Sequence, residues 1–240
     1  MTPWRLLLDE SPRDGATNMA LDEALFRDAE EGRQTRPVLR LYGWSPPCLS
    51  LGYHQDPALA ADAQFCQRNA IDIVRRPTGG LAVLHDDEVT YAVAGPFGAE
   101  PFRGLDLGGT YAVLAGALVE GLASLGLPAV LSRRQARAVP TSTAPCFQVP
   151  TADEVLVHGR KVVGSAQRRG RRAFLQHGAV PLSVDYALLL GATGRPGADP
   201  APYRAAFAGL KDFLPGLTQQ ALRAALLEGF RLRLDASFEK

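Results

Sequence analysis

Residues 71–93, IDIVRRPTGGLAVLHDDEVTYAV, combine two strand-like segments with a loop that holds charged residues and glycines. In both segments apolar residues recur at a period of two, which is typical of β-strands. Gly79 and Gly80 allow positive φ angles and let a ligand approach the backbone. Arg75 and Arg76 bring planar donors suited to a carboxylate or phosphate. We therefore expect two strands facing each other across a ligand-binding loop; a sharp turn with solvated arginines is equally compatible with this composition.

The composition is that of a globular chain with a substantial core. It has 240 residues, 46% of them hydrophobic, which predicts one domain spanning residues 1–240. A net charge of +1 gives no general attraction to nucleic acid or membranes. Cys48, Cys66 and Cys146 lack Cys-x-x-Cys spacing, which argues against a disulfide framework and a zinc site. Because the first residues lack a signal-peptide core and no apolar run reaches membrane-spanning length, we expect a cytoplasmic protein.

Hydrophobic periodicity and turn residues divide the chain into strands and helices. Strands are expected at residues 4–8, 38–42, 49–53 and 173–182, and a hairpin at 155–166 that turns at His158-Gly159. Helices are expected at residues 15–30, 58–68, 110–125 and 218–232.

Residues 132–151, SRRQARAVPTSTAPCFQVPT, have no clear periodicity. A loop this long inside a compact domain is usually functional or disordered. Cys146 lies in it between Pro145 and Phe147, whereas structural cysteines are normally found on apolar faces. The residue type alone leaves both a reactive and an inert thiol open, and we interpret Cys48 and Cys66 as small buried hydrophobes.

Several motifs occur in an order that is more informative than any one of them. The chain resembles the biotin/lipoate protein ligase family, and within it the LipM-type octanoyltransferases, over residues 4–232. The resemblance depends on NMALDEA at 18–24, RRPTGG at 75–80, VLH at 83–85, Glu88-x-x-Tyr91, Cys146-Phe147, GRKxxGSAQ at 159–167 and QHG at 176–178.

The resemblance implies an α+β fold whose mixed, mainly antiparallel β-sheet is flanked by helices, as in class II aminoacyl-tRNA synthetases and biotin ligases. It implies an acyltransferase of lipoate biosynthesis that moves an octanoyl group from acyl carrier protein, through a cysteine thioester, to a lysine. That lysine belongs to a lipoyl-type domain, for which the glycine-cleavage H protein is the usual acceptor. No cofactor, metal, nucleic acid or membrane is implied.

By the same resemblance, Cys146 is the nucleophile and Lys161 stabilises the thiolate and the oxyanion. Lys161 is also the first candidate for the base that accepts the proton of the acceptor amine, with His85 and His177 as weaker candidates. The remaining residues implied in substrate binding are Arg75, Arg76, Thr78, Gly79, Gly80, His85, Tyr91, Gly164, Ser165, Ala166 and His177.

Two basic clusters are candidates for docking acidic partner proteins. They comprise Arg133, Arg134 and Arg137 in the long loop, and Arg168, Arg169, Arg171 and Arg172 in a hairpin turn. A solvated hairpin tip is the alternative for the second cluster. Two positions depart from the family pattern: Leu81 stands where a basic residue or glycine is common, and Gln148 where an acidic residue is common.

Three other readings remain open. An ATP- and Mg-dependent lipoate–protein ligase acts on free lipoate without a cysteine, and such enzymes usually carry an additional C-terminal domain or subunit. A biotin ligase is disfavoured because its Gly-Arg-Gly-Arg-type loop is absent from the central stretch. A non-catalytic module that binds the acyl carrier would keep the pocket without the reaction.

Overall fold

The computed structural model describes residues 2–132 and 154–239, and its centre is a long antiparallel strand pair. Strand β6 (Glu88–Pro96) pairs with β11 (Ala173–Pro181) from Glu88↔Pro181 to Pro96↔Ala173. Nearly every residue of the two strands is buried, because helices cover both faces of the sheet. The pair lies at the centre of the structure, and the other elements pack around it.

The pair belongs to a six-stranded sheet with the strand order β10-β11-β6-β2-β1-β12. The sheet is antiparallel from β10 to β2 and parallel between β2, β1 and β12, so it is mixed and mainly antiparallel, as predicted. The other four strands of this sheet are β10 (Gly164–Arg169), β2 (Val38–Tyr42), β1 (Thr2–Leu8) and β12 (Ala236–Glu239).

Two three-stranded sheets flank the large one. The first contains β3 (Cys48–Leu51), β4 (Asp72–Arg75) and β5 (Val83–His85). The second contains β7 (Ala129–Leu131), β8 (Val155–Val157) and β9 (Arg160–Lys161).

The prediction that the two strand segments of residues 71–93 face each other is wrong. β4 pairs in parallel with β3, whereas β6 lies in the large sheet. Their burial differs accordingly: β4 alternates between half-buried and exposed residues, as a surface strand does, and β6 is buried along almost its whole length. The period of two identified both strands but could not assign their partners.

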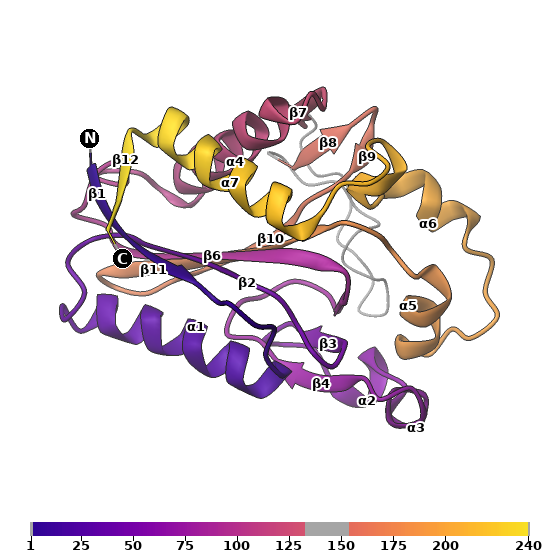
Figure 1. Ribbon diagram of the computed structural model, residues 1–240. Coiled ribbons are helices and arrows are strands. Elements are labelled where there is room, and N and C mark those ends of the chain that lie inside the picture. Colours follow the sequence, from indigo (N-terminus) through magenta and orange to yellow (C-terminus); the bar gives the residue numbers. More distant parts are fainter. Residues whose placement is uncertain (1, 133–153, 240) are drawn as a thin grey trace.

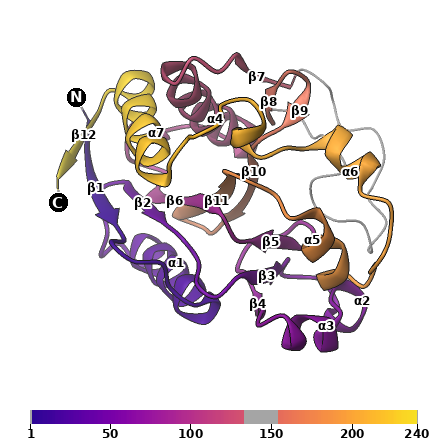
Figure 2. The same cartoon turned by 45° about the vertical axis from the view of Figure 1, so that its right-hand side comes forward.

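Helices cover the sheet on both faces (Figures 1 and 2). Helix α1 (Gly15–Glu30) lies on one face, and α4 (Leu107–Ser124) and α7 (Gln219–Leu234) lie side by side on the other. Shorter elements are α2 (Pro57–Ala60), α3 (Ala63–Arg68), α5 (Tyr186–Ala192), α6 (Ala201–Ala206) and the 3₁₀ turn η2 (Leu210–Asp212).

Capping residues explain where many of these helices begin. The N-cap side chains accept a hydrogen bond from a backbone amide of the first turn in α1, α2, α3, α4, α5 and α7, through Asp14, Asp56, Asp62, Asp106, Asp185 and Thr218. Asp62 also explains one difference from prediction: the single helix expected at residues 58–68 is two helices, because Asp62 caps a new one.

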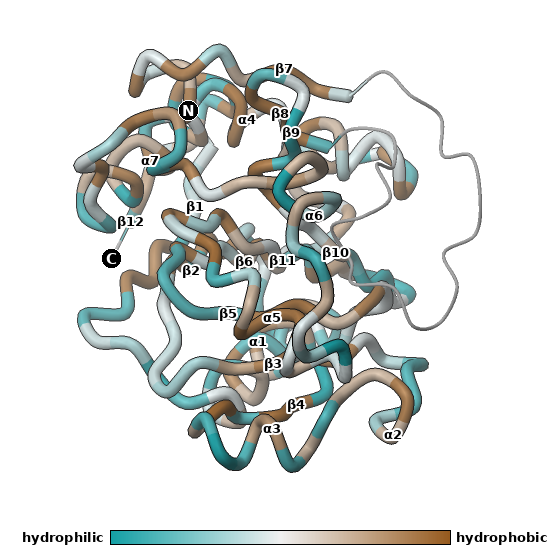
Figure 3. Tube along the Cα trace, turned by 90° about the vertical axis from the view of Figure 1, so that its right-hand side faces the viewer, coloured by the Kyte–Doolittle hydropathy of each residue, from teal (hydrophilic) through white to brown (hydrophobic). Residues whose placement is uncertain are grey.

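Helices α4 and α7 pack at very short range. A Cβ atom built on Gly229 of α7 would lie 2.2 Å from the backbone oxygen of Ala117 in α4, and one on Gly121 would lie 2.6 Å from that of Ala225. Figure 3 shows hydrophobic and hydrophilic residues alternating along α7, and its buried residues face this contact and the sheet. Although α4 is apolar and long enough to cross a membrane by length and composition, here it packs in the core.

We expect Gly229→Ala to lower the free energy of unfolding by about 1–3 kcal/mol, because an added methyl group overpacks this contact. Gly108→Ala is the control, since its Cβ would meet only Asp106 Oδ1 at 3.8 Å and alanine favours the helix. Urea denaturation of both variants measures the difference. An equal effect of the two substitutions would contradict the close packing.

Candidate active site

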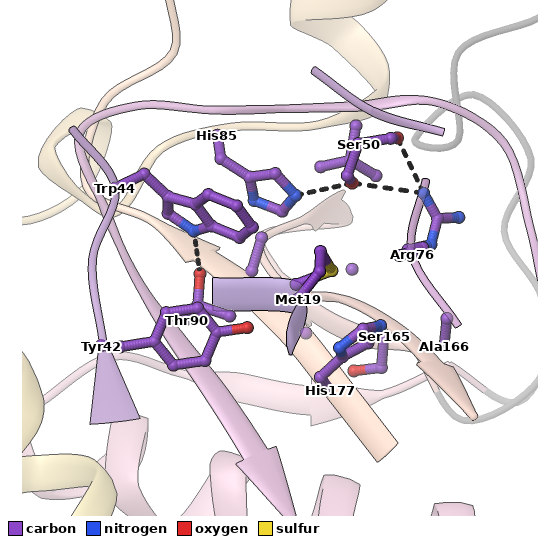
Figure 4. Close-up of a pocket in the computed structure, with 14 residues that line it drawn as sticks. Met19, Tyr42, Trp44, Ser50, Arg76, His85, Thr90, Ser165, Ala166 and His177 are labelled. Atoms are coloured by element: carbon purple, nitrogen blue, oxygen red, sulfur yellow. Dashed lines mark hydrogen bonds between the residues drawn. The ribbon is translucent and has the colours of Figure 1, made fainter. Parts of the chain in front are cut away.

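A pocket lies between helix α1, the large sheet and the small sheet of β3 to β5 (Figure 4). The space between the lining atoms is about 380 Å³, and part of it is open to solvent. Most of its surface is apolar. Its lining is Met19, Tyr42, Trp44, Ser50, Arg76, Val83, His85, Thr90, Gly164, Ser165, Ala166, His177, Gly178 and Ala179.

Trp44 and Tyr42 lie on the side of the pocket opposite Arg76 and Ala166 (Figure 4). The indole of Trp44 stacks on His85 with ring centroids 4.1 Å apart, and its Nε1 donates to Thr90 Oγ1 at 2.7 Å. Both aromatic side chains are buried. They form the inner end of the pocket.

The other end of the pocket adjoins a groove. Met19 and Arg76 line both the pocket and this groove, which also contains Tyr53, Arg75 and Arg168. A ligand that enters here would meet Met19 and Arg76 first.

Arg76 is buried and holds the glycine loop in place. Its Nη2 donates to the carbonyl oxygens of Gly79 at 2.6 Å and Leu81 at 2.8 Å, and its Nη1 to that of Ser50 at 2.9 Å. Gly80 has a φ of +91°, a conformation that favours glycine. The guanidinium therefore fixes the loop itself.

Two imidazole–carboxylate pairs flank Arg76. His177 contacts Asp22 through Nδ1 and Thr78 Oγ1 through Nε2, at 2.8 and 2.7 Å. His85 contacts Glu88 through Nδ1 and Ser50 Oγ through Nε2, again at 2.8 and 2.7 Å.

Both hydroxyls in turn accept hydrogen bonds from Arg76, at 3.2 Å for Thr78 and 3.3 Å for Ser50. The donors therefore run outward from Arg76 through each hydroxyl and imidazole to a carboxylate.

On the His177 side, this direction requires a neutral imidazole that accepts from Thr78 and donates to Asp22. Burial lowers the pKa of His177, although its contact with Asp22 acts in the opposite sense. Asp22 also accepts from Arg40 Nη1 and from the hydroxyl of Tyr42, each at 2.8 Å. The buried carboxylate thus has a cationic partner of its own, so that His177 can remain neutral.

Lys161 lies on β9, three residues before the first pocket residue of β10. Its Nζ contacts Glu154 Oε1 at 2.5 Å, and both side chains are buried. Cys146, the predicted nucleophile, lies outside the described residues. Burial raises the pKa of the thiols of Cys48 and Cys66, which agrees with their interpretation as buried hydrophobes.

Of the predicted substrate-binding residues, the structure brings six into the pocket lining: Arg76, His85, Gly164, Ser165, Ala166 and His177. Thr78, Gly79 and Gly80 belong to the loop that Arg76 holds. Arg75 points elsewhere, since its Nη1 donates to the carbonyls of Gly52, Tyr53 and Gln55.

Tyr91 lies outside the pocket lining. Its ring packs in the core against Phe230 of α7. Its hydroxyl contacts Ser165 Oγ at 2.7 Å and accepts from Gln176 at 2.9 Å, and burial raises its pKa to about 12. Tyr91 therefore supports Ser165 of the pocket wall from the core.

Sequence reasoning assigned no role to eight lining residues, namely Met19, Tyr42, Trp44, Ser50, Val83, Thr90, Gly178 and Ala179. It also missed the three acidic partners Asp22, Glu88 and Glu154. Met19 and Asp22 occur together in the NMALDEA motif, three positions apart, and this spacing places them on one helix face.

The hairpin-turn arginines have contacts within the molecule. The guanidinium of Arg169 lies 4.0 Å from the ring centre of Phe97 and donates to Thr110 and Leu105, and that of Arg168 lies over Phe26. Reversing the charge of Arg169 would therefore disturb the fold as well as the binding of any partner protein. The other basic cluster lies outside the described residues.

A mixed sheet with a small, mostly apolar pocket against it is typical of a domain that binds a small ligand. Residues 14–231 match the lipoyl protein ligase A/B catalytic domain. The chain belongs to this family, as its motifs predicted.

Curated relatives include octanoyltransferases LipM. That of Moorella thermoacetica is 45% identical over 186 residues, which cover 76% of this chain and 66% of the relative. That of Kyrpidia tusciae is 44% identical, with 77% and 68% covered. The chain thus spans about two thirds of the length of these relatives.

Solved structures agree with the fold. A putative lipoate protein ligase from T. acidophilum with bound lipoic acid superposes with a TM-score of 0.79 at 26% identity, covering 99% of this chain and 88% of the other. A lipoate-protein ligase A bound with ATP gives 0.78 at 27% identity, with the same coverage. The predicted fold class is confirmed.

Because burial lowers the pKa of His177, the unfolded chain binds more protons than the folded one below pH 6.5, the ordinary value. We expect the free energy of unfolding to fall as the pH is lowered through 6.5, with a His177 contribution of up to about 1.4 kcal/mol per pH unit. Urea denaturation between pH 7.5 and 5 measures this slope. His177→Gln should flatten it and the exposed control His54→Gln should not; equal slopes in all three proteins would contradict the assignment.

Proposed function

We propose that this chain is an octanoyltransferase of lipoate biosynthesis. It moves an octanoyl group from a carrier thioester, through a thioester on Cys146, to a lysine of a lipoyl-type domain. The observation that carries the proposal is the 40–45% identity to curated octanoyltransferases LipM. A largely apolar pocket on the same fold supports it, because an acyltransferase needs a cavity for the acyl chain.

In the first step, the Cys146 thiolate attacks the carbonyl carbon of the carrier thioester. A new carbon–sulfur bond forms, and the pantetheine thiolate leaves and takes up a proton. Because one thioester replaces another, the exchange needs no nucleotide. The ammonium of Lys161 stabilises the negative charge that develops on sulfur and on the carbonyl oxygen.

In the second step, the acceptor lysine attacks the acyl-enzyme as a free amine. A carbon–nitrogen bond forms, the Cys146 thiolate leaves, and the product is an amide. The acceptor has a reference pKa of about 10.4, so a group of the enzyme must accept a proton at neutral pH. The Nε2 atoms of His85 and His177 are occupied by hydroxyls, which disfavours both as that base.

The pocket suits the acyl chain in shape and polarity. Met19, Val83 and Ala179 contribute apolar surface between the entrance and Trp44. Its polar groups are hydrogen-bonded to one another, so an alkyl chain would leave none of them newly unpaired. These contacts support a fatty-acyl ligand over a polar one.

The same proposal includes partners and location. The donor is octanoyl-acyl carrier protein, the acceptor is a lipoyl-type domain such as the glycine-cleavage H protein, and no cofactor is required. Residues 1–240 form a single catalytic domain in the cytoplasm. Arg171 and Arg172 remain candidates for docking acidic partner domains.

An ATP-dependent lipoate–protein ligase is the second candidate. Solved neighbours with bound lipoic acid and with bound ATP share this fold at 26% and 27% identity. The octanoyltransferase relatives are more similar in sequence, and they favour transfer.

Incubation with octanoyl-carrier protein should add one octanoyl group to the wild-type protein, and hydroxylamine should remove this group. Intact-mass measurement detects both changes. Cys146→Ala should lose the adduct and octanoyl transfer, because the thiol is the acyl acceptor. Cys48→Ala is the matched control and should keep both. Lipoylation that depends on ATP and survives Cys146→Ala would support the ligase. If the protein shows neither activity, the non-catalytic carrier-binding module is the remaining interpretation.

Trp44→Leu should lengthen the acyl chain that the enzyme prefers, because it opens the inner end of the pocket. We expect kcat/KM for dodecanoyl relative to octanoyl thioesters to rise about ten-fold or more. Trp4→Leu makes the same substitution in the core behind the sheet, and it should lower stability without changing the ratio. An unchanged ratio in Trp44→Leu would mean that the acyl chain does not reach the inner end of the pocket.

A further inference from the structure

The groove beside the pocket follows one side of helix α1. Met19 and Arg76 line both, so the groove and the pocket adjoin at these two residues. Ala16 and Ala20 of α1 and Val74 of β4 give the groove apolar walls. A ligand that is too long for the pocket therefore has an apolar path beside the pocket for its remaining length.

Arg168 places a positive charge in this groove. It lies on β10 two residues after Ala166, a pocket residue, and alternate residues of a strand share one face, about 6.8 Å apart. The guanidinium of Arg168 lies over the ring of Phe26 of α1, 4.7 Å from the ring centre. Phe26 is buried, so this ring is a firm support. The charge is therefore held beyond the pocket rather than at its lining.

The guanidinium of Arg168 differs from those of the two other arginines of the groove. Arg75 and Arg76 donate to backbone carbonyl oxygens of neighbouring loops. Within residues 2–132 and 154–239, Arg168 makes its ring contact but no hydrogen bond or ion pair. A guanidinium that lies flat on a ring keeps the N–H groups along its edge available to an oxyanion. Arg168 is therefore equipped to bind a phosphate or a carboxylate.

The groove as a whole is positive. Glu23 lines it together with Arg75, Arg76 and Arg168. The carboxylate of Glu23 is half exposed and lies 3.9 Å from the guanidinium of Arg27, which offsets its charge. An anion in the groove is therefore attracted to Arg168 without strong repulsion from Glu23.

The order of these features indicates the kind of ligand. An apolar pocket adjoins a groove with apolar walls, and a cation with available donors lies two strand residues beyond the pocket. A free fatty acid carries its charge at the end of the alkyl chain, so this charge would lie at the mouth of the pocket. An acyl thioester of 4′-phosphopantetheine instead has an alkyl chain, an uncharged arm and then a phosphate. Its order of groups matches that of the protein.

We propose that the groove holds the pantetheine arm of the octanoyl-carrier thioester and that Arg168 binds the phosphate of this arm. The inference rests on the proposed function and adds a binding site for the donor. The phosphate of a carrier-bound arm is a diester with one negative charge, and a guanidinium can bind it through two parallel N–H···O bonds. The arm, held at its far end, keeps the thioester at the mouth of the pocket while the acyl chain fills the pocket.

Two probes that cannot be cleaved test the site, namely the S-octyl thioethers of 4′-phosphopantetheine and of pantetheine. They differ only in the phosphate. Calorimetry should give the wild-type protein a Kd for the phosphorylated probe that is lower by about ten-fold or more, as hydrogen bonds to a charged group contribute. Arg168→Gln should bind the two probes with similar Kd values, because its side chain has no charge to offer the phosphate.

The same variant should be affected in turnover of the natural donor. We expect Arg168→Gln to raise the KM for octanoyl-carrier protein about ten-fold or more. The effect should lie in KM rather than in kcat, because the phosphate is remote from the bond that breaks. Steady-state transfer of octanoyl to the acceptor domain measures both constants.

Arg231→Gln is the matched control. Arg231 lies on α7, on the other face of the sheet, is exposed, and pairs with Glu228 at 2.8 Å. Its substitution removes the same charge and should keep the wild-type ratio of the two Kd values. Arg168→Met retains a long side chain over Phe26 without a charge. It should behave like Arg168→Gln and carries the test if that variant does not fold.

The results separate the two proposals. A wild-type protein that transfers no octanoyl group from octanoyl-carrier protein overturns the proposed function. Equal Kd values of the two probes for the wild-type protein overturn the phosphate site, and so does a wild-type ratio in the neutral Arg168 variants. A ratio that is lost equally in Arg231→Gln also overturns it, because the overall charge would then explain the preference. A raised KM for the acceptor domain with an unchanged Kd ratio overturns it as well, since Arg168 would then contact the acceptor.

Discussion

The burial of one guanidinium, that of Arg76, constrains the whole pocket. A buried cation is tolerated only if its donors are satisfied. Here loop carbonyls and two hydroxyls satisfy them, and each hydroxyl is held by an imidazole that is held by a carboxylate. These groups come from α1, both neighbouring sheets and the glycine loop. One charge thus ties together elements that are far apart in the sequence, and it fixes the shape of the cavity they enclose.

The ionisable groups around the pocket are paired with one another. Asp22 is paired with Arg40, and Glu88 lies within the circuit that ends at Arg76. Lys161 lies apart from them on another hairpin and contacts its own carboxylate, that of Glu154. The two sets of charges are thus separate electrostatic units.

Much of this could be predicted from the sequence, for reasons that are local. The period of two in β6 and the Leu repeat of α4 identify elements because burial follows backbone geometry. The RRPTGG, VLH, GRKxxGSAQ and QHG motifs identified the family and six lining residues. Pairing could not be predicted in the same way, since β4 and β6 have similar patterns but join different sheets.

The acidic partners were missed for a related reason. Asp22 lies 155 residues from His177, and nothing in either segment alone reveals the contact. The role of Trp44 could not be predicted either, because it depends on contacts with Thr90 of β6 and His85 of β5.

Helix α1 is tied to its surroundings at both ends. At its start, the amide of Gly15 donates to Asp72 of β4 at 3.2 Å. At its end, the carboxylate of Glu30 accepts from the amides of Arg171, Arg172 and Ala173. A helix clamped in this way cannot slide or tilt to make space. Met19 lines the pocket from this clamped helix, so a ligand meets a flexible thioether carried on a fixed backbone.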